Sequence, residues 1–293
     1  MNPLLYSIAF VFLVGLLAWP VGKWLTWTVR TTRLDPFLAI LLGKNIGQGS
    51  NWKQYFLHLL GYNAVMFAIT WGVLANQQHL PFNPDGMKAI PWHLVFNTTV
   101  SFVTNTNLQH YSGESTLSHL SQLTLMWLQF TSAATGIAAF VALTRGLAGS
   151  RNCGNFAHDT ARILILFLLP LAALWAAAYT LTGVPMTMQG SATATTLEGA
   201  TQMISRGPVA AFLAIKQLGT NGGGFFGPNS THPFENPTFL SNFISMIAIP
   251  IIPMACVTTF GALLGSPRHA RVIGAVMLAF LLIKVTITVL PES

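Results

Sequence analysis

The chain has 293 residues, of which 52% are apolar and 7% are charged. A soluble globular domain carries about 25% charged residues, so this composition excludes an ordinary water-soluble globule. The mean hydropathy of +0.57 indicates instead that much of the surface faces lipid. The formal net charge of +7 does not indicate nucleic-acid binding, because the basic residues stand singly between apolar runs and form no stripe. The two cysteines make no disulfide framework.

Six apolar stretches have the length of membrane-spanning helices. About 20 apolar residues carry a helix across the hydrocarbon core of a bilayer. The six predicted spans are residues 4–19, 55–74, 117–143, 163–181, 239–264 and 272–290. We therefore predict an all-α polytopic membrane protein that is surrounded by membrane lipid.

The charges between the spans predict the orientation. Cations concentrate in alternate loops, namely Lys23, Arg30, Arg33, Lys44 and Lys53 in the first, Arg145, Arg151 and Arg162 in the third, and Arg268 and Arg271 in the fifth. The remaining loops hold far fewer, namely Lys88, Arg206 and Lys216. By the positive-inside rule the cation-rich loops are cytoplasmic, so both termini are expected on the extracytoplasmic side.

Two shorter apolar segments, residues 91–103 and 207–218, are too brief to cross a bilayer, and each begins near a proline. Segments of this length are candidates for re-entrant helices, and proline is tolerated in a first helical turn. Each is followed by a polar cluster. The first polar cluster is residues 104–107 (Thr-Asn-Thr-Asn), and the second polar cluster is residues 219–224 (Gly-Thr-Asn-Gly-Gly-Gly). We expect residues 105–107 and residues 219–221 to occupy matching places.

The order of span, short segment, polar cluster and span therefore occurs twice. The predicted divisions are a first spanning helix with a cytoplasmic loop (1–54), repeat 1 (55–143), a cytoplasmic loop (144–162), repeat 2 (163–264), and a cytoplasmic turn with a sixth spanning helix (265–293). Repeats that place short interrupted segments at equivalent depth point to a binding site at their interface.

The two polar clusters have the composition of a cation-binding turn. Irregular backbone within a bilayer is tolerated only where it is buried in protein or lines water. Consecutive carbonyls can point at one axis only if alternate residues reach positive φ, which Gly and Asn do more readily than other residues. Such carbonyls, helped by Thr hydroxyls and by the partially negative ends of the preceding helices, can replace the hydration shell of a monovalent cation. The candidate ligands are Thr104, Asn105, Thr106 and Asn107, and Gly219, Thr220, Asn221, Gly222 and Gly223. The alternative is a pair of turns that only reverse the chain.

Two acids follow the clusters on the expected extracytoplasmic side. Glu114 and Glu235 are candidates for a vestibule that concentrates cations, or they are simply solvated loop acids. A third ionisable residue, Lys284, lies inside the sixth predicted span. Its role is left open between a functional charge within the membrane and a side chain that extends outward to the interface, which we favour.

Two other functions remain open. His232 and Glu235, together with His110, suggest a membrane metalloenzyme, although Pro233 and Pro237 disfavour the helix that would align the first two side chains. An assembly module that holds the helices of a partner without contacting ions is the other alternative.

Several strings resemble a known family. Residues 101–114 (Ser-Phe-Val-Thr-Asn-Thr-Asn-Leu-Gln-His-Tyr-Ser-Gly-Glu), 218–226 (Leu-Gly-Thr-Asn-Gly-Gly-Gly-Phe-Phe) and 229–237 (Asn-Ser-Thr-His-Pro-Phe-Glu-Asn-Pro) closely resemble KdpA, the potassium-binding component of the bacterial potassium-transporting Kdp ATPase. Residues 51–55 (Asn-Trp-Lys-Gln-Tyr) are similar to the same family, and the resemblance covers nearly the whole chain.

The resemblance implies a channel-like component of the bacterial inner membrane that selects K⁺ from the outside and passes it to a P-type ATPase partner. K⁺ is then the only metal involved, and the chain itself carries no catalytic residue. The implied partners are KdpB, which hydrolyses ATP with Mg²⁺, and KdpC and KdpF, which assist assembly. The residues that carry over are Asn105, Thr106, Asn107 and Gln109 in the first filter and Gly219, Thr220, Asn221, Gly222 and Gly223 in the second.

The chain departs from the family in two ways. Leu108 stands where the family usually has Trp, which would slacken the packing behind the first filter. Family members have four pore-loop repeats, whereas this sequence has two repeats and the first helix of what resembles a third. The expected explanations are a truncated, non-conducting product, a split protein that a second polypeptide completes with repeats 3 and 4, or a self-associating half-channel.

Overall fold

The computed structural model describes the backbone of residues 3–43 and 48–289. Lys44, which we counted in the first cation-rich loop, and Leu290, the expected end of the sixth span, lie outside the described residues. Within the described part, six helical stretches are long and apolar enough to cross a membrane, which confirms the predicted number of spans. They are α1 (Pro3–Arg30), α3 (Trp52–Ala75), α6 (His119–Leu147), α7 to α8 (Phe156–Leu181), α10 (Phe239–Leu264) and α11 (Pro267–Val289).

Most span boundaries differ from the expected ones. Helix α1 continues to Arg30 and includes Pro20, where the sequence suggested an end after residue 19. The charge of Lys23 is accommodated in this extension because its ammonium group lies 3.4 Å from the centre of the Trp19 ring, in a cation–π contact. The fourth span begins at Phe156 rather than at residue 163, and it is interrupted between α7 (Phe156–Ile163) and α8 (Leu169–Leu181) by the π-helical turn η3 (Leu164–Leu168).

The two short segments are helices of the expected length. Helix α4 covers Trp92–Val103 and α9 covers Val209–Leu218, and each follows a proline at its N-cap, Pro91 and Pro208. Shorter helical pieces that were not expected are α2 (Asp35–Leu42), η2 (Gln77–His79), α5 (Gly113–Thr116) and η4 (Asn229–Thr231).

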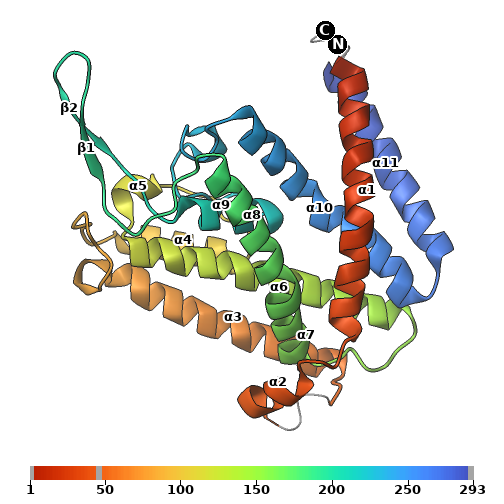
Figure 1. The fold of residues 1–293 in the computed structure, drawn as a ribbon. Coiled ribbons are helices and arrows are strands. Elements are labelled where there is room, and N and C mark those ends of the chain that lie inside the picture. Colours follow the sequence, from red (N-terminus) through yellow and green to blue (C-terminus); the bar gives the residue numbers. More distant parts are fainter. Residues whose placement is uncertain (1–2, 44–47, 290–293) are drawn as a thin grey trace. The chain divides into compact units, whose positions relative to one another are not determined.

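In the described part of the chain, one antiparallel hairpin interrupts the all-α pattern. Strand β1 (Ala192–Thr195) pairs with β2 (Thr201–Ile204), with Ala192 opposite Ile204 and Thr195 opposite Thr201. Figure 1 shows it extending away from the helices of its own unit. Its residues are mostly exposed or half-buried, so the hairpin has no buried apolar face that the sequence pattern could reveal.

The contacts divide the chain into two compact units. Unit 1 comprises Met1–Tyr55, Ile137–Ile163 and Ile249–Ser293, and unit 2 comprises Phe56–Gly136 and Leu164–Ala248. Both short helices and both polar clusters belong to unit 2.

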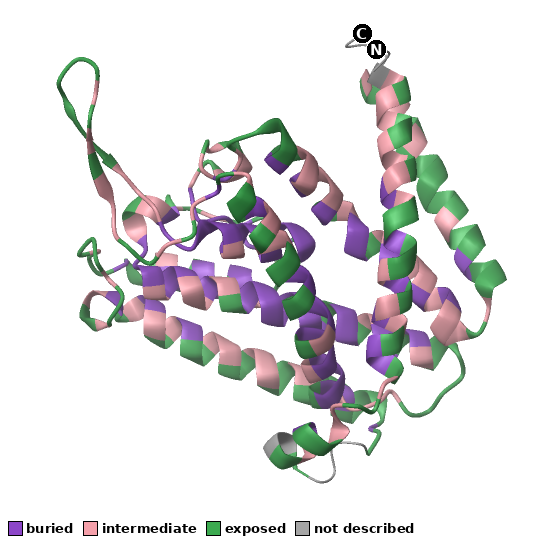
Figure 2. Ribbon diagram, in the orientation of Figure 1, coloured by how far each residue is buried: buried purple, intermediate pink, exposed green. Residues whose placement is uncertain are grey.

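In unit 1, α1 contacts α7, α10 and α11. At Gly22 the backbone of α1 comes so close to α10 that a Cβ atom there would lie 2.7 Å from the Ala255 carbonyl oxygen and from Thr258 Cβ. The Thr259 hydroxyl donates to the Gly22 carbonyl oxygen over 3.0 Å. Small residues allow membrane helices to approach in this way. Helix α11, in contrast, is exposed along most of its length (Figure 2).

In unit 2 the short helix α9 is the most buried element. Nine of its residues are buried, and they include Lys216 and Gln217 as well as the apolar side chains. It packs mainly against α8. The first half of α6 buries polar side chains, among them Gln122, Gln129 and Ser132. A buried polar helix face needs partners, and the polar clusters provide them.

Candidate functional site

The backbone turns in the same way at the ends of α4 and α9. Three hydrogen bonds close each helix end, at 3.0, 3.3 and 2.9 Å after α4 and at 2.7, 3.2 and 3.2 Å after α9. After α4, these bonds join Thr104 N to Val100 O, Asn105 N to Phe102 O and Thr106 N to Ser101 O. After α9, they join Gly219 N to Ile215 O, Thr220 N to Gln217 O and Asn221 N to Lys216 O. The two turns are therefore structural repeats of one another.

This geometry corrects the expected register by one residue. We expected Asn105 to match Gly219, but the hydrogen bonds match Asn105 with Thr220 and Thr104 with Gly219. The expected register placed Thr106 opposite Thr220 and Asn107 opposite Asn221, whereas the backbone aligns by distance from the helix end.

Alternate residues of both clusters have positive φ, as the carbonyl argument predicts. In the first cluster φ is 63° at Asn105 and 51° at Asn107, and in the second it is 54° at Thr220 and 95° at Gly222. Asn and Gly reach this region at low cost, but a β-branched residue such as Thr220 does so only under strain. Strained backbone of this kind is concentrated at functional sites in proteins.

Asn105 connects the two clusters. Its Nδ2 atom donates to the Gly219 carbonyl oxygen over 3.4 Å, and its Oδ1 atom accepts from Asn221 Nδ2 and, over 2.7 Å, from the Ser132 hydroxyl. The side chain thus joins the first cluster to the second and both to α6.

Gln109 makes a second link. Its Nε2 atom donates to the Gly224 carbonyl oxygen and its Oε1 atom accepts from Gly224 N, both over 2.9 Å. Because Asn105 contacts Gly219 and Gln109 contacts Gly224, the two clusters run side by side in the same direction.

Asn107 and Gly223 pack together between these two links. A Cβ atom on Gly223 would lie 2.9 Å from Asn107 Cβ and 2.7 Å from Phe102 Cζ, so only glycine fits there. Asn107 is buried, and neither its amide nitrogen nor its amide oxygen has a hydrogen-bond partner among the described residues. An unpaired amide at this depth has a desolvation cost that a bound ion or water would offset.

Two glutamines of α6 hold carbonyl groups of the second cluster and its continuation. Gln129 Nε2 donates to the Gly223 carbonyl oxygen over 2.6 Å, and Gln122 Nε2 donates to the Phe225 carbonyl oxygen over 3.0 Å. Neither residue was singled out from the sequence, since a Gln inside an apolar helix shows no partner by itself.

The two candidate vestibule acids are engaged by backbone rather than left free. Gly227 N donates to Glu114 Oε2 over 2.7 Å, and Phe226 N donates to Glu235 Oε1 over 3.2 Å. Glu235 is buried and forms an ion pair with Lys216 of α9, with 2.6 Å between Oε2 and Nζ. It is therefore neither an exposed vestibule acid nor a solvated loop acid. Its charge is already compensated inside the protein.

Two residues of the metalloenzyme hypothesis, His232 and Glu235, have other partners. The His232 ring stacks on Phe226 with 3.7 Å between ring centroids, and its Nδ1 atom accepts from Phe234 N over 3.1 Å. Burial lowers the pKa of His232 below its usual value despite the opposing charges of Glu114 and Glu235. No group of three metal-ligating side chains occurs within the residues that the structure describes.

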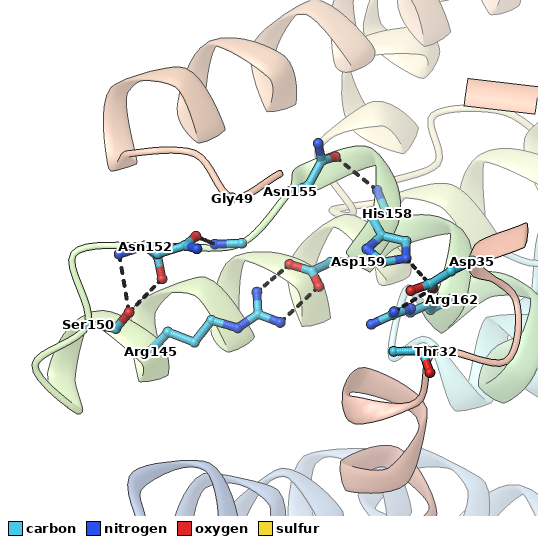
Figure 3. Close-up of a pocket in the computed structure, with 11 residues that line it drawn as sticks. Thr32, Asp35, Gly49, Arg145, Ser150, Asn152, Asn155, His158, Asp159 and Arg162 are labelled. Atoms are coloured by element: carbon cyan, nitrogen blue, oxygen red, sulfur yellow. Dashed lines mark hydrogen bonds and ion pairs between the residues drawn. The ribbon is translucent and has the colours of Figure 1, made fainter. Parts of the chain in front are cut away.

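A separate group of charged side chains lies in unit 1 (Figure 3). Asp35 Oδ1 accepts from Arg162 Nη2 over 2.6 Å and lies 2.7 Å from His158 Nε2, and Arg145 pairs with Asp159. These residues line a cavity of about 430 Å³. Burial alone raises the pKa of Asp35, but hydrogen bonds and charge from Arg162 and His158 outweigh it and hold that pKa below its usual value.

From the sequence, Arg145 and Arg162 were interpreted only as orientation signals. Their acidic partners stand far from them or in another loop, so the spacing alone did not reveal these ion pairs.

Lys284, whose role was left open, is exposed in the second half of α11.

Within the described residues, six helices long and apolar enough to span a membrane, together with two shorter helices that end in paired turns, define a multi-pass membrane protein. The sequence profile of the potassium-transporting ATPase A subunit matches residues 8–293. The chain therefore belongs to the KdpA family.

Individual relatives agree with this assignment. The chain is similar to several proteins that share the name potassium-transporting ATPase potassium-binding subunit. The one from Leptospira interrogans is 43% identical over 97% of this chain and 52% of its own length. The one from Pseudomonas putida is 50% identical over 83% of this chain and 44% of its own length, and the one from Flavobacterium psychrophilum is 42% identical over 100% and 53%. The chain spans about half the length of the curated relatives it matches.

Proposed function

We propose that this chain is the K⁺-binding, channel-like part of an ATP-driven potassium import complex. The first polar cluster with Gln109 and the second polar cluster through Gly223 are the parts of a filter that take the place of water around K⁺. The observation that carries the proposal is the alternation of positive φ in two parallel turns. Such alternation lets successive carbonyl oxygens face one side, which is the arrangement that a dehydrated monovalent cation requires.

Three further features support a cation rather than an anion. Helices α4 and α9 direct their C-terminal, partially negative ends toward the clusters. The amide of Asn107 is buried without a partner among the described residues, and its oxygen is a suitable cation ligand. Lys216, the basic residue nearest the second cluster, is neutralised by Glu235.

In this proposal the two helix, pore-loop, helix repeats predicted at residues 55–143 and 163–264 are kept, with their outer helices extended as observed, so that α6 ends at Leu147 and α7 begins at Phe156. K⁺ enters from the extracytoplasmic side, both termini lie on that side, and the membrane is the bacterial inner membrane. KdpB hydrolyses ATP with Mg²⁺, and KdpC and KdpF complete the complex. The names of the relatives support potassium binding within an ATPase complex.

Cation binding tests the proposal. The purified chain in lipid nanodiscs, alone and together with its partner proteins, is titrated with radioactive rubidium in competition with K⁺ and Na⁺. We expect saturable binding that K⁺ displaces and Na⁺ does not. Gly222→Asp is informative because a Cβ atom at Gly222 meets nothing within 4 Å, so the variant adds a carboxylate at the filter at the cost of backbone strain from a φ of 95°. The filter assignment is wrong if Gly222→Asp, Thr106→Ala and Asn107→Ala all retain wild-type K⁺ affinity and K⁺/Na⁺ discrimination.

Orientation is tested separately. A reporter enzyme that is active only outside the cytoplasm is fused before residue 1 in one protein and inserted in the 144–162 loop in another. We expect the N-terminal fusion to be active and the loop insertion to be inactive. The opposite pattern would reverse the assigned direction of K⁺ entry.

A further inference from the structure

A buried ion pair stands directly behind the second polar cluster. Lys216 Nζ and Glu235 Oε2 are 2.6 Å apart, and their side chains are 3% and 1% exposed. Lys216 also donates to the Ser230 hydroxyl over 3.1 Å, and Gln217 donates to the same oxygen over 2.9 Å. Charges at this depth persist only where a partner and further hydrogen bonds compensate for their lost hydration.

Each member of the pair is also bonded to the backbone of the cluster or its continuation. The Lys216 carbonyl oxygen accepts from Asn221 N over 3.2 Å, and Glu235 Oε1 accepts from Phe226 N over 3.2 Å. Between these two points, a Cβ atom on Gly224 would lie 2.6 Å from Glu235 Oε1 and 2.8 Å from Lys216 Nζ. Within residues 221–226, the side chains of the ion pair are thus packed against Gly224 and the Phe226 amide, and the main chain of Lys216 holds Asn221.

The first polar cluster has no such charge at the matching place. The register established by the helix ends matches Lys216 with Ser101. Ser101 accepts from Leu108 N over 2.7 Å through its hydroxyl oxygen. A neutral hydroxyl therefore holds the first cluster, whereas a buried ion pair holds the second, glycine-rich one. Three consecutive glycines have little intrinsic conformational preference, so the second cluster needs an external constraint that the first does not.

We propose that Lys216 and Glu235 are positioning residues for the second filter. Their ion pair fixes the path of residues 221–226 and thereby the spacing on which discrimination between K⁺ and Na⁺ depends. This inference rests on the proposed function, because it names what holds the same filter in place.

The test compares local backbone opening with cation discrimination. The main variant is the neutral pair Lys216→Met/Glu235→Gln. Glu235→Asp is a milder second variant, which keeps the negative charge but is one methylene too short to reach both Lys216 and Phe226 N. The matched control is Arg145→Met/Asp159→Asn, which removes an ion pair of unit 1, where Asp159 is buried. Each full-length variant is reconstituted in nanodiscs. Amide hydrogen exchange of residues 219–227 and 104–109 is then measured, together with rubidium binding in competition with Na⁺.

We expect the neutral pair to speed exchange in residues 219–227 by about tenfold, because the Phe226 N–H then bonds to a neutral amide oxygen in place of a carboxylate, while residues 104–109 stay unchanged. K⁺/Na⁺ discrimination should fall by a similar factor, and Glu235→Asp should show the same pattern at smaller amplitude. The control should lower the melting temperature without changing either filter readout.

Wild-type exchange and wild-type discrimination in both the neutral pair and Glu235→Asp would overturn the inference. Equal acceleration of exchange in both clusters would also overturn it, because that result shows general loosening. If the wild-type chain binds neither cation in either preparation, the proposed function fails, and the exchange data still decide whether the ion pair positions the backbone.

Discussion

Asn105 and Thr220 occupy the same position in their two turns, and both have positive φ, 63° and 54°. They differ in what their side chains do. Asn105 bonds to Ser132, Gly219 and Asn221, whereas the Thr220 hydroxyl donates to the carbonyl oxygen of its neighbour Gly219 over 2.8 Å. The same backbone conformation is therefore maintained by side-chain bonds in one repeat and imposed on a strained residue in the other.

Glycine substitution should separate these two causes. Thr220→Gly should raise stability by about 1 kcal/mol, because glycine removes the strain of a β-branched residue at positive φ. Asn105→Gly should instead lower stability by about 1–3 kcal/mol, because it removes three side-chain hydrogen bonds. Thermal unfolding in one detergent measures both. Equal effects of the two substitutions would contradict the distinction.

Alanine at two adjacent glycines should act by different mechanisms. Gly222→Ala meets no atom within 4 Å but keeps φ at 95°, so it should cost about 1 kcal/mol from backbone strain alone. Gly223→Ala brings a Cβ atom to within 2.7 Å of Phe102 and 3.0 Å of the Asn107 carbonyl oxygen, so it should separate the two clusters and abolish rubidium binding. Gly72→Ala in α3, where nothing lies within 4 Å, is the control and should behave as wild type. Normal rubidium binding by Gly223→Ala would show that the clusters need not touch.

Asp35 should make stability depend on acid pH. The folded state holds the Asp35 pKa below that of the unfolded chain, which is about 4. The stabilisation is therefore present above pH ~4 and is lost as the pH falls through the lower, folded pKa. Melting temperatures measured down this range should fall for the wild type and change less for Asp35→Asn. Parallel curves for the two proteins would mean that the contacts with Arg162 and His158 contribute little.

Tyr55 and Asp159 should differ strongly in their contribution to stability. The Tyr55 hydroxyl lies 3.0 Å from the Ala138 carbonyl oxygen and 3.2 Å from Asp159 Oδ2, so Tyr55→Phe should cost about 1 kcal/mol. Asp159→Ala leaves the Arg145 guanidinium without its carboxylate and should cost about 3 kcal/mol or more. Denaturant or thermal titration in detergent checks the order. A larger loss in Tyr55→Phe would reverse our view of which group holds this cluster together.

The spans and the short helices could be predicted from the sequence because length and apolarity decide them locally. The bounds of α10 agree with those of the predicted span in spite of Pro250 and Pro253, since an apolar run of that length can be satisfied only as a helix in lipid. The positive φ values of Asn105, Asn107 and Gly222 were also predictable, because they follow from the intrinsic preferences of Asn and Gly.

Other features depended on which segments meet. The one-residue register shift and the strain at Thr220 follow from how each helix end sets the backbone of its turn. The burial of Glu235 depends on Lys216, a partner distant in the chain. A hydropathy pattern gives no information about which distant residues become partners. The β1–β2 hairpin was missed because strand pairing without a buried face leaves no apolar alternation. The sequence by itself determined a polytopic helical protein with two polar turns of alternating positive φ, because these follow from local composition and backbone preference. Only the tertiary structure decided how the turns align and which charges hold them, because long-range hydrogen bonds and ion pairs form only once the chain has packed.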